Sequence, residues 1–482
     1  MAPSEGGIWR ATVAAVSLLL SLAMGAGLDQ IEVGGPWGSP TATGGTAPWW
    51  NPAGMAMDSG HRYQLELAPS FAVMEFTRDE PNGGSDRYTA SGVLPQFGFA
   101  SDFGIDGLGI GAAIVVPKVR GGNAGDPISG PGRYTMKSGR VQTIYGMVGM
   151  GFRPIEQVSV GGVVAVVNSR FLAEVNKDSL PDLAAALDDA GEVHEYTDED
   201  LEQPEYAIRT EFQAGDIVMT AGASLMLRPH PKLDVGVTYL HGPTVQNVGT
   251  ASLAFACPPQ EDTVGRFAAE SRGMCDTDIT STVAASYTLP NRVHGGVTFR
   301  PNLRWRVEAM GGWVGWSSMD DVTITLSDTA ERNPDWVAAY DAAEETANEV
   351  IDGKQVQTRS LSNAVWGAVD AKWTRPVLGS RPLTLGGRVG FDQSAVPDHT
   401  LATNNFDADI LMLTGMASFG LHPALTLGGS WTHSILETRT TQSAYYQSVE
   451  SPNPEPGYNH PHTSGTYDGH VNRFGVHLRG AF

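Results

Sequence analysis

The sequence is poor in cysteine. Its 482 residues contain two, Cys257 and Cys275, and both lie in one segment rich in Gly, Pro and Asp. Two cysteines alone cannot make a structural zinc site, which needs four ligands. In an oxidising compartment they can close a short loop, which stabilises the fold by about 3 kcal/mol in the chain-entropy model. We therefore predict a Cys257–Cys275 disulfide and expect no metal site and no cofactor.

Long apolar runs and positive charge are scarce as well. Beyond the N-terminus no stretch is long enough to cross a bilayer as a helix, and the mean hydropathy is −0.16. This excludes a helical membrane protein but fits a soluble protein or a transmembrane β-barrel, whose strands are apolar on one side only. The formal net charge of −22 repels phosphate groups, so we expect no nucleic-acid partner.

Enzyme motifs are missing. Residues 428–432 (Gly-Gly-Ser-Trp-Thr) lack the final glycine of a nucleophile elbow, and residues 121–132 lack the Lys-Ser/Thr of a phosphate-binding loop. His460, His462 and His470 lie in or beside one loop without carboxylates at metal-ligand spacing. We predict that the protein is not an enzyme.

The N-terminus has the layout of a secretory signal. Arg10 precedes an apolar core over 11–24, and small residues follow at Ala23, Gly25 and Ala26. The prediction is a signal peptide over 1–25 and an exported protein.

After residue 60 the sequence alternates with a period of two residues, which is typical of strands. In 303–317 the odd positions are mostly apolar, with Trp305 and Trp313 near the two ends, whereas the even positions begin with charged residues. Tryptophan at two levels of an apolar face is typical of the interfacial girdles of membrane barrels. The last segment also alternates and ends in Phe482, as do the terminal strands that the outer-membrane barrel assembly machinery reads.

Proline marks tight turns between these segments, because it fixes φ and cannot donate to a ladder. The turns contain Arg153-Pro154, Arg228-Pro229, Arg300-Pro301, Arg375-Pro376 and His422-Pro423. Long polar loops alternate with them near 120–138, 171–213, 246–280, 327–358, 394–405 and 441–466. Short turns on one side and long loops on the other predict an all-β, monomeric transmembrane antiparallel barrel of about fourteen strands over 61–482. A soluble propeller would need a repeated blade motif, which we do not find.

Residues 26–60 differ from the rest. They are too rich in Gly, Pro and Thr for a helix or central strand, yet they contain Trp37, Trp49 and Trp50, which prefer burial. We predict a hatch that plugs the barrel lumen.

Several motifs resemble one family. Residues 45–54, with Asn51-Pro52-Ala53, resemble the hatch of the outer-membrane long-chain fatty-acid and aromatic-hydrocarbon transporters of the FadL/TodX type. Ile-Val-Val-Pro at 114–117 resembles the third strand of that family, and 305–309 with 313–320 resemble its central hairpin. Its C-terminal signatures are matched at 391–398 (Phe-Asp-Gln-Ser-Ala-Val-Pro-Asp) and 465–469.

The resemblance implies a plugged fourteen-stranded barrel in the outer membrane of a Gram-negative bacterium, in contact with lipid and lipopolysaccharide. Its members take up hydrophobic small molecules without an energy source. Ligand enters a groove between the loops at 171–213 and 246–280, reaches a pocket at the hatch, and leaves through a gap made by a kink in the third strand. The implied site comprises hatch residues Trp37, Trp49, Trp50, Asn51, Pro52 and Ala53, and kink residues Gly107, Gly109, Gly111 and Pro117.

The substrate stays open at this stage. The net acidity and the acidic loop over 174–205 would repel carboxylates, so neutral hydrocarbons and other lipids compete with fatty acids. That loop is either solvated decoration or a divalent-cation bridge to lipopolysaccharide. Arg170, near the mouth of the fifth strand, is a candidate for binding a ligand headgroup or an ordinary rim charge. A general diffusion porin and a structural barrel are the alternative functions.

Overall fold

The computed structural model describes most of the chain from residue 32 onward. The described residues are 32–79, 83–126, 130–132, 137–178, 180, 207–258, 260, 262, 266, 269–270, 273–275, 277–340, 343–377, 381–403, 405–441 and 464–482. The predicted signal peptide over 1–25, residues 181–205 of the acidic loop and most of the last predicted loop lie outside the described residues.

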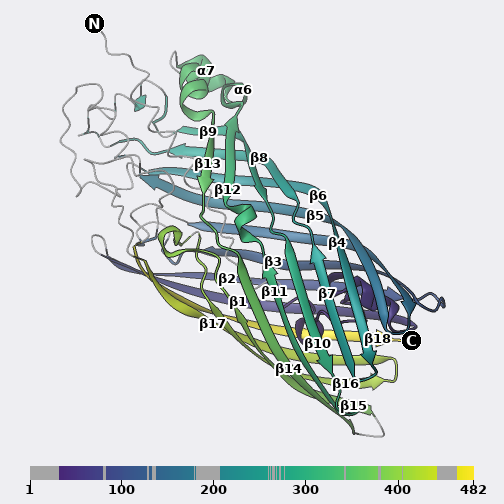
Figure 1. Cartoon of the computed structure of the whole chain (residues 1–482). Helices are drawn as coiled ribbons and strands as arrows, with labels where there is room; N and C mark the ends of the chain where they lie inside the picture. The colour runs from purple at the N-terminus through teal and green to yellow at the C-terminus, as the bar shows by residue number, and fades with distance from the viewer. Residues whose placement is uncertain are drawn as a thin grey trace.

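The strands form one closed antiparallel sheet (Figure 1). β1 (His61–Arg78) pairs with β2 (Gly84–Ser101) on one side and with β18 (Gly465–Ala481) on the other, so the first and last strands close a barrel. The remaining strands are β3 (Leu108–Asn123), β4 (Ser138–Ile155), β5 (Val158–Asp178), β6 (Ala207–His230), β7 (Leu233–Leu240), β8 (Thr244–Phe255), β9 (Thr277–Thr288), β10 (Arg292–Phe299), β11 (Trp305–Val314), β12 (Asp321–Ser327), β13 (Gly353–Thr358), β14 (Ala364–Val377), β15 (Arg381–Asp392), β16 (Ile410–His422) and β17 (Leu425–Thr441).

These eighteen segments make fourteen positions around the wall, because four positions consist of two segments each. β7 and β8 both pair with β6 and together make one position. β10 pairs with β7 and β9 pairs with β8, so β10 and β9 make the next position. β11 and β12 share the third divided position, beside β10 and β9. β14 and β13 share the fourth, beside β11 and β12. The prediction of an all-β barrel of about fourteen antiparallel strands is confirmed.

The four interrupted positions are neighbours in the wall, and side chains replace part of the missing ladder there. Asn291 Oδ1 accepts a hydrogen bond from Gly242 N at 3.0 Å. Asp320 Oδ1 accepts one from Leu361 N at 2.8 Å. The interruptions cover residues 241–243, 289–291, 315–320 and 359–363, and the third contains the 3-10 helix η5 (Trp316–Met319).

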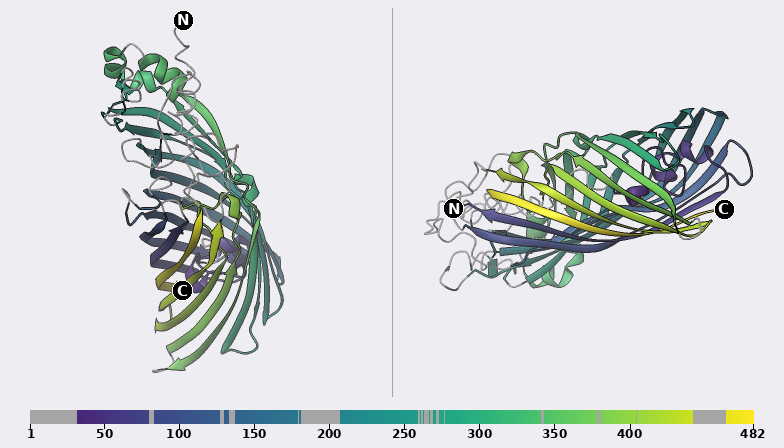
Figure 2. Two further views of the ribbon diagram at one scale, coloured as in Figure 1. Left: turned by 90° about the vertical axis from the view of Figure 1, so that its left-hand side faces the viewer. Right: turned by 90° about the horizontal axis from the view of Figure 1, so that it is seen from below.

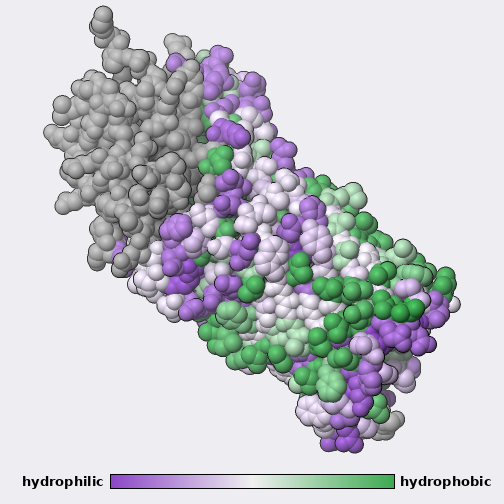
Figure 3. All heavy atoms as spheres, in the orientation of Figure 1, coloured by the Kyte–Doolittle hydropathy of each residue, from purple (hydrophilic) through white to green (hydrophobic). Residues whose placement is uncertain are grey.

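Side chains alternate between the outer face and the lumen. On β11, Trp305 and Val307 are exposed, whereas Glu308 and Met310 are buried. Figure 3 shows hydrophobic residues gathered over the half of this face nearer the C-terminus, with hydrophilic residues beyond them at both ends. Such a belt is typical of a surface that contacts lipid. No helix among the described residues is both long and apolar enough to cross a membrane.

The two ends of the barrel differ. The turn end, which holds the C-terminus, has short connections such as 156–157 between β4 and β5. The opposite, loop end has long connections. One of these contains α6 (Thr329–Arg332), α7 (Pro334–Ala339), α8 (Ala343–Glu345) and the π-helix η6 (Thr346–Ile351). Another, between β8 and β9, contains Cys257 and Cys275, whose sulfur atoms are bonded to each other.

The ladder between β2 and β3 is open in the middle of the wall. Gln96 and Val115 are Cα partners, and pairing resumes only at Thr89 with Asn123. Residues 90–95 of β2 therefore have no Cα partner on β3. We call these residues, together with 116–122 of β3, the ladder gap.

A bulge on the other edge of β3 lies at the same level. Val115 has Tyr145 of β4 as its Cα partner, and the register shifts before pairing resumes at residue 118 with Thr143. Pro117 lies within this shift. Proline has no N–H to donate, so it favours such an irregularity.

Candidate functional site: the hatch and the lumen above it

The hatch segment, residues 32–60, lies inside the barrel (Figure 2). It forms η2 (Gly35–Trp37), α3 (Ala47–Trp50) and η3 (Pro52–Ala56). It hydrogen-bonds to strands all around the wall, which requires a place in the lumen. The wall residues in these bonds include Arg62, Gln96, Ser159, Ser224, Thr238, His294, Glu308 and Arg388.

Glycines in the wall let the backbone of the hatch approach. A Cβ at Gly98 would lie 1.8 Å from the carbonyl oxygen of Gly45, and one at Gly236 would lie 2.0 Å from that of Pro40. No side chain fits at these distances. The two glycines therefore mark points where the main chains of wall and hatch touch.

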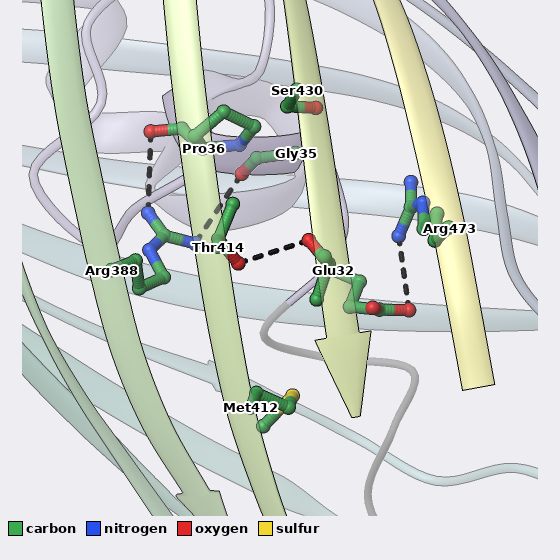
Figure 4. A pocket seen from close by; sticks show the side chains of 9 residues that line it. Glu32, Gly35, Pro36, Arg388, Met412, Thr414, Ser430 and Arg473 are labelled. Atoms are coloured by element: carbon green, nitrogen blue, oxygen red, sulfur yellow. Dashed lines mark hydrogen bonds and ion pairs between the residues drawn. The ribbon is translucent and has the colours of Figure 1, made fainter. Parts of the chain in front are cut away.

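Ion pairs hold the first part of the hatch. Arg473 Nη1 lies 3.1 Å from Glu32 Oε2, and its Nη2 lies 2.7 Å from Glu66 Oε1 on β1. Arg388 donates to backbone carbonyls of η2, and its Nη2 lies 2.9 Å from Asp370 Oδ2. Figure 4 shows both guanidinium groups directed at the hatch from the strands of the wall. Arg473 and Arg388 thus each have a carboxylate partner, which stabilises a buried charge.

Neutral hydrogen bonds hold the Asn-Pro-Ala segment. Asn51 is fully buried, and its Nδ2 donates to Pro40 O at 2.7 Å and to Leu225 O of β6 at 3.2 Å. Pro52 opens η3, where a missing N–H is tolerated. The side chain of Asn51 therefore joins two parts of the hatch to the wall.

Ala53 continues this attachment. Its N–H donates to Ser224 Oγ of β6 at 2.8 Å, and its carbonyl accepts from Ser159 Oγ of β5 at 2.8 Å. Both main-chain groups are thereby satisfied by serines of the wall, as buried polar groups need to be.

The three tryptophans of the hatch occupy two environments. Trp49 packs edge-on against Tyr145 of β4, with ring centroids 5.2 Å apart, and Trp50 packs against Trp366 of β14 at 6.0 Å. Trp37 instead lies beside a cation, with Arg479 Cζ 4.2 Å from its ring centroid. Trp49 and Trp50 belong to the apolar interior, whereas Trp37 belongs to the charged zone.

Above the hatch, towards the loop end, inward side chains form one buried apolar cluster that includes Trp49, Trp50 and Met55. We call its members on the wall the apolar lining; among them are Phe171, Val175, Ile208, Phe212, Leu253, Ile279, Val283, Val322 and Ile324. Transfer of a hydrocarbon from water to such an apolar surface is favourable by about 0.8 kcal/mol of free energy per methylene.

The four residues expected to kink the third strand are divided between different places. Gly107 lies in the turn before β3 at a φ of 75°. A Cβ at Gly109 would lie 2.3 Å from Met55 C, and one at Gly111 would lie 2.5 Å from Met55 Sδ. These two glycines therefore accommodate the hatch. Among the four, Pro117 is the one at the ladder gap.

Arg170 faces away from the lumen. It lies on β5 with the same parity as Val166 and Leu172, whose side chains are 44% and 42% exposed. A one-residue step along a strand changes the face, so the sequence position alone did not determine it. This orientation fits the alternative, an ordinary charge at the barrel rim, better than the expected contact with a ligand headgroup.

Arg292, Arg388 and the two glycines that touch the hatch, Gly98 and Gly236, were not among the predicted site residues. Arg388 lies in a strand with inward parity, and that parity was the available signal. Its partners come from distant parts of the chain and could not be read from local spacing.

Among the described residues, the ligating atoms close enough to hold a metal ion belong to Cys257, Glu270 and Cys275. The two sulfur atoms form the disulfide and are not available as thiolate ligands.

No protein-family model matches the sequence, and no curated protein matches it. Solved structures do match. A Pseudomonas aeruginosa FadL homologue has a TM-score of 0.70 at 15% identity, with 95% of this chain and 98% of that chain covered. This is the FadL/TodX fold. The P. putida toluene transporter TodX gives 0.63 at 13% identity, with 95% and 99% covered. The Ralstonia pickettii toluene transporter TbuX gives 0.57 at 15% identity, with 95% and 99% covered.

The FadL/TodX fold confirms the architecture expected from the resemblance. At these identities the likeness concerns the fold, so the functional residues of this chain have to be argued from its own contacts. Those contacts place a firmly attached hatch under an apolar lining, with the ladder gap beside them.

Proposed function

We propose that this protein is a passive outer-membrane transporter that takes up hydrophobic small molecules, such as long-chain fatty acids, other lipids or hydrocarbons. The observation that carries the proposal is the apolar lining above the hatch, next to the ladder gap. A chain of about 16 carbons would lose about 12 kcal/mol on passing from an apolar site into a water-filled pore. An apolar route with a sideways exit avoids that loss.

On this proposal, ligand enters at the loop end between the β5–β6 and β8–β9 connections and binds against the apolar lining. The hatch is its floor, with Trp49, Asn51, Pro52 and Ala53 as the movable part. Support for a link between hatch and exit comes from Gln96, at the edge of the ladder gap, whose Oε1 accepts a hydrogen bond from Gly34 N of the hatch at 2.5 Å.

The proposal also implies which membrane surrounds the barrel. The outward apolar belt contacts the lipid and lipopolysaccharide of a Gram-negative outer membrane, into which the barrel assembly machinery inserts a monomer. Two solved structures of this fold are of toluene transporters, which supports the proposal of a hydrophobic cargo for this protein.

Binding by the purified protein tests the cargo class. In nonionic detergent we expect N-phenyl-1-naphthylamine to bind with enhanced fluorescence and to be displaced by hexadecanoate or toluene. In planar bilayers we expect no steady ion conductance, because the hatch occupies the lumen. Conductance without binding of any hydrophobe would show a general diffusion porin, and the absence of both would show a structural barrel.

Gly92 tests the sideways exit. It lies in the ladder gap, and no atom lies within 4 Å of the place of its Cβ, so a large side chain fits there. We expect Gly92→Trp to lower uptake by cells several-fold without changing fluorophore binding by the purified protein. Gly146→Trp is the control, because that site is equally open but has Cα partners on both neighbouring strands. Undiminished uptake by the Gly92 variant would contradict the sideways exit.

A further inference from the structure

Basic residues gather on one side of the turn end. The segments 297–307, 371–387 and 415–430 contain the turn-end parts of β10, β11 and β14 to β17, and they hold no Asp or Glu, although the chain carries a net charge of −22. Three exposed arginines lie there, Arg304, Arg375 and Arg381. Figure 3 shows hydrophilic residues at this end directly beside the hydrophobic belt. This side of the barrel therefore presents positive charge at the edge of the surface that contacts lipid.

Other arginines of the turn end have carboxylate partners. Arg153 pairs with Asp106. Arg228 and Arg300 both pair with Asp234, at 2.7 Å and 2.5 Å. Among the described residues no carboxylate lies within ion-pair distance of the three exposed arginines, so their charge is available to an anion from outside the protein.

The three exposed arginines are neighbours. Arg375 and Arg381 lie at outward positions of β14 and β15, and Val377 is the Cα partner of Arg381. The two arginines are therefore diagonal neighbours, about 7–8 Å apart and within reach of one another's long side chains. Thr374 N donates to the carbonyl oxygen of Arg304 at 2.8 Å, which places Arg304 beside the same end of β14. One tetrahedral anion can contact guanidinium groups at this spacing.

Two tryptophans lie between these arginines and the apolar belt. Trp305 is 44% exposed, and its Cα partner Trp373 lies at an outward position of β14. Arg375 Cζ lies 5.6 Å from the ring centroid of Trp373, so the face of the guanidinium is covered while its N–H donors at the edge can still bind an anion. Exposed Val307 and Leu385 continue the apolar surface away from the turn. Tryptophan is enriched at the level of lipid headgroups, which is the level at which these arginines lie.

We propose that Arg304, Arg375 and Arg381, with Trp305 and Trp373, bind the phosphate of an anionic glycerophospholipid in the periplasmic leaflet. Short turns of bacterial barrels face the periplasm, and arginine binds phosphate through paired hydrogen bonds. The acyl chains lie along the apolar outer faces of β11 and β15. A soluble phosphate would use the arginines alone, whereas a lipid uses the tryptophans and the apolar face as well. The inference rests on the membrane location in the proposed function and is independent of the cargo.

The test compares two lipids that share their acyl chains and differ in net charge. Native mass spectrometry of the purified protein in nonionic detergent measures the affinities of dioleoyl phosphatidylglycerol and dioleoyl phosphatidylcholine. Each arginine at an anionic surface favours binding by about fivefold, so the three predict a preference for phosphatidylglycerol of roughly 10-fold to 100-fold. We expect the triple variant Arg304→Gln, Arg375→Gln, Arg381→Gln to lose most of this preference, while its affinity for phosphatidylcholine stays within about twofold of the wild type.

Arg170→Gln is the matched control for the single variant Arg375→Gln. Arg170 also lies on the outer face, but away from the turn end. Arg375→Gln should lower the preference several-fold, and Arg170→Gln should leave it unchanged. Equal affinity of the wild type for the two lipids, or a preference that survives in the triple variant, would overturn the inference. Displacement of phosphatidylglycerol by excess inorganic phosphate would assign the patch to a soluble anion and overturn the lipid as its occupant.

Two further measurements separate this site from folding and from transport. Without lipid, the triple variant should unfold at the same temperature as the wild type, because exposed side chains without ion pairs contribute little to stability. Phosphatidylglycerol should raise the unfolding temperature of the wild type more than that of the variant. A large drop in stability of the lipid-free variant would show that the arginines are structural.

Binding of N-phenyl-1-naphthylamine should be the same in wild type and triple variant. Its absence from the wild type would overturn the proposed cargo and leave the lipid site standing. Absence of the lipid preference alone would overturn the lipid site and leave the proposed function standing.

Discussion

The lumen is charged around the hatch and largely apolar above it. Beside the hatch, Arg388 and Arg473 pair with Asp370 and Glu66 and bind the hatch directly. Above it, the apolar lining is built from side chains such as Phe212 of β6, which is 3% exposed. Both zones are formed by inward positions of strands in one barrel, so the difference comes from the side chains at these positions and not from the type of fold.

The two kinds of interaction respond differently to a guest. Hydrogen-bonded ion pairs tolerate little displacement, because a separated charge remains buried. Apolar contacts are non-directional and can be exchanged for contacts with a hydrocarbon at little loss. The charged zone therefore fixes the hatch, and the apolar zone is suited to accept ligands of varied shape.

Arg473→Met should have the largest effect. It leaves the carboxylates of Glu66 and Glu32 without their shared cation, and removal of one partner of a buried pair costs about 3–5 kcal/mol. We expect a lower free energy of unfolding in urea, measured in detergent micelles, and faster proteolysis of the hatch segment.

The double variant Arg473→Met, Glu66→Leu provides the control. Because it removes both members of the better buried pair, it should recover part of the lost stability. If the double variant is the less stable of the two, the ion pair is not what stabilises the charged zone.

The fold followed from short-range patterns. Alternation placed Trp305 outside and Glu308 inside, and prolines such as Pro154 and Pro229 marked the turn end. The breaks that divide four strand positions were not predicted, since an insertion such as 315–320 continues the composition of the strand around it.

The site was harder to predict because barrel closure brings distant residues together. Glu66 and Arg473 are 407 positions apart and still bond, since β1 and β18 are neighbours. The hatch motif was visible in Asn51-Pro52-Ala53, but its partners on β5 and β6 were not. Arg170 illustrates the same limit, because the face of a strand residue depends on a register that one residue can invert.

Gly98→Val should have the second-largest effect on stability. Its Cβ would overlap the carbonyl oxygen of Gly45, so the hatch has to move or the wall has to bend. Overpacking of this kind costs about 1–3 kcal/mol. We expect a smaller decrease in stability than for Arg473→Met, together with ion conductance in planar bilayers as the plug loosens.

Gly415→Val is the control for this change, because no atom lies within 4 Å of the place of its Cβ. It should behave as the wild type in both measurements. A closed, fully stable Gly98 variant would mean that the hatch is less tightly seated than the backbone contact indicates.

Asp58→Asn should have the smallest effect and a pH signature. Thr43 Oγ1 donates to Asp58 Oδ2 at 2.6 Å, and Arg228 Nη1 lies 3.2 Å from Oδ1. Burial raises the pKa of Asp58, but the Thr43 hydrogen bond and the Arg228 charge outweigh it, so the pKa lies below its ordinary value. Such a carboxyl stabilises the folded state above its unfolded pKa, and this contribution is lost as the pH falls towards the folded value.

The urea midpoints of wild type and Asp58→Asn should therefore differ fully above about pH 5 and converge below about pH 3. The difference should be small, since the side chain of Asp58 is 43% exposed and solvent screens the pair. A difference that does not change with pH would assign the effect to the altered hydrogen bond with Thr43. A convergent difference would show that the charge of Asp58 attaches the end of the hatch to β6, which extends the charged zone to the last residues before β1.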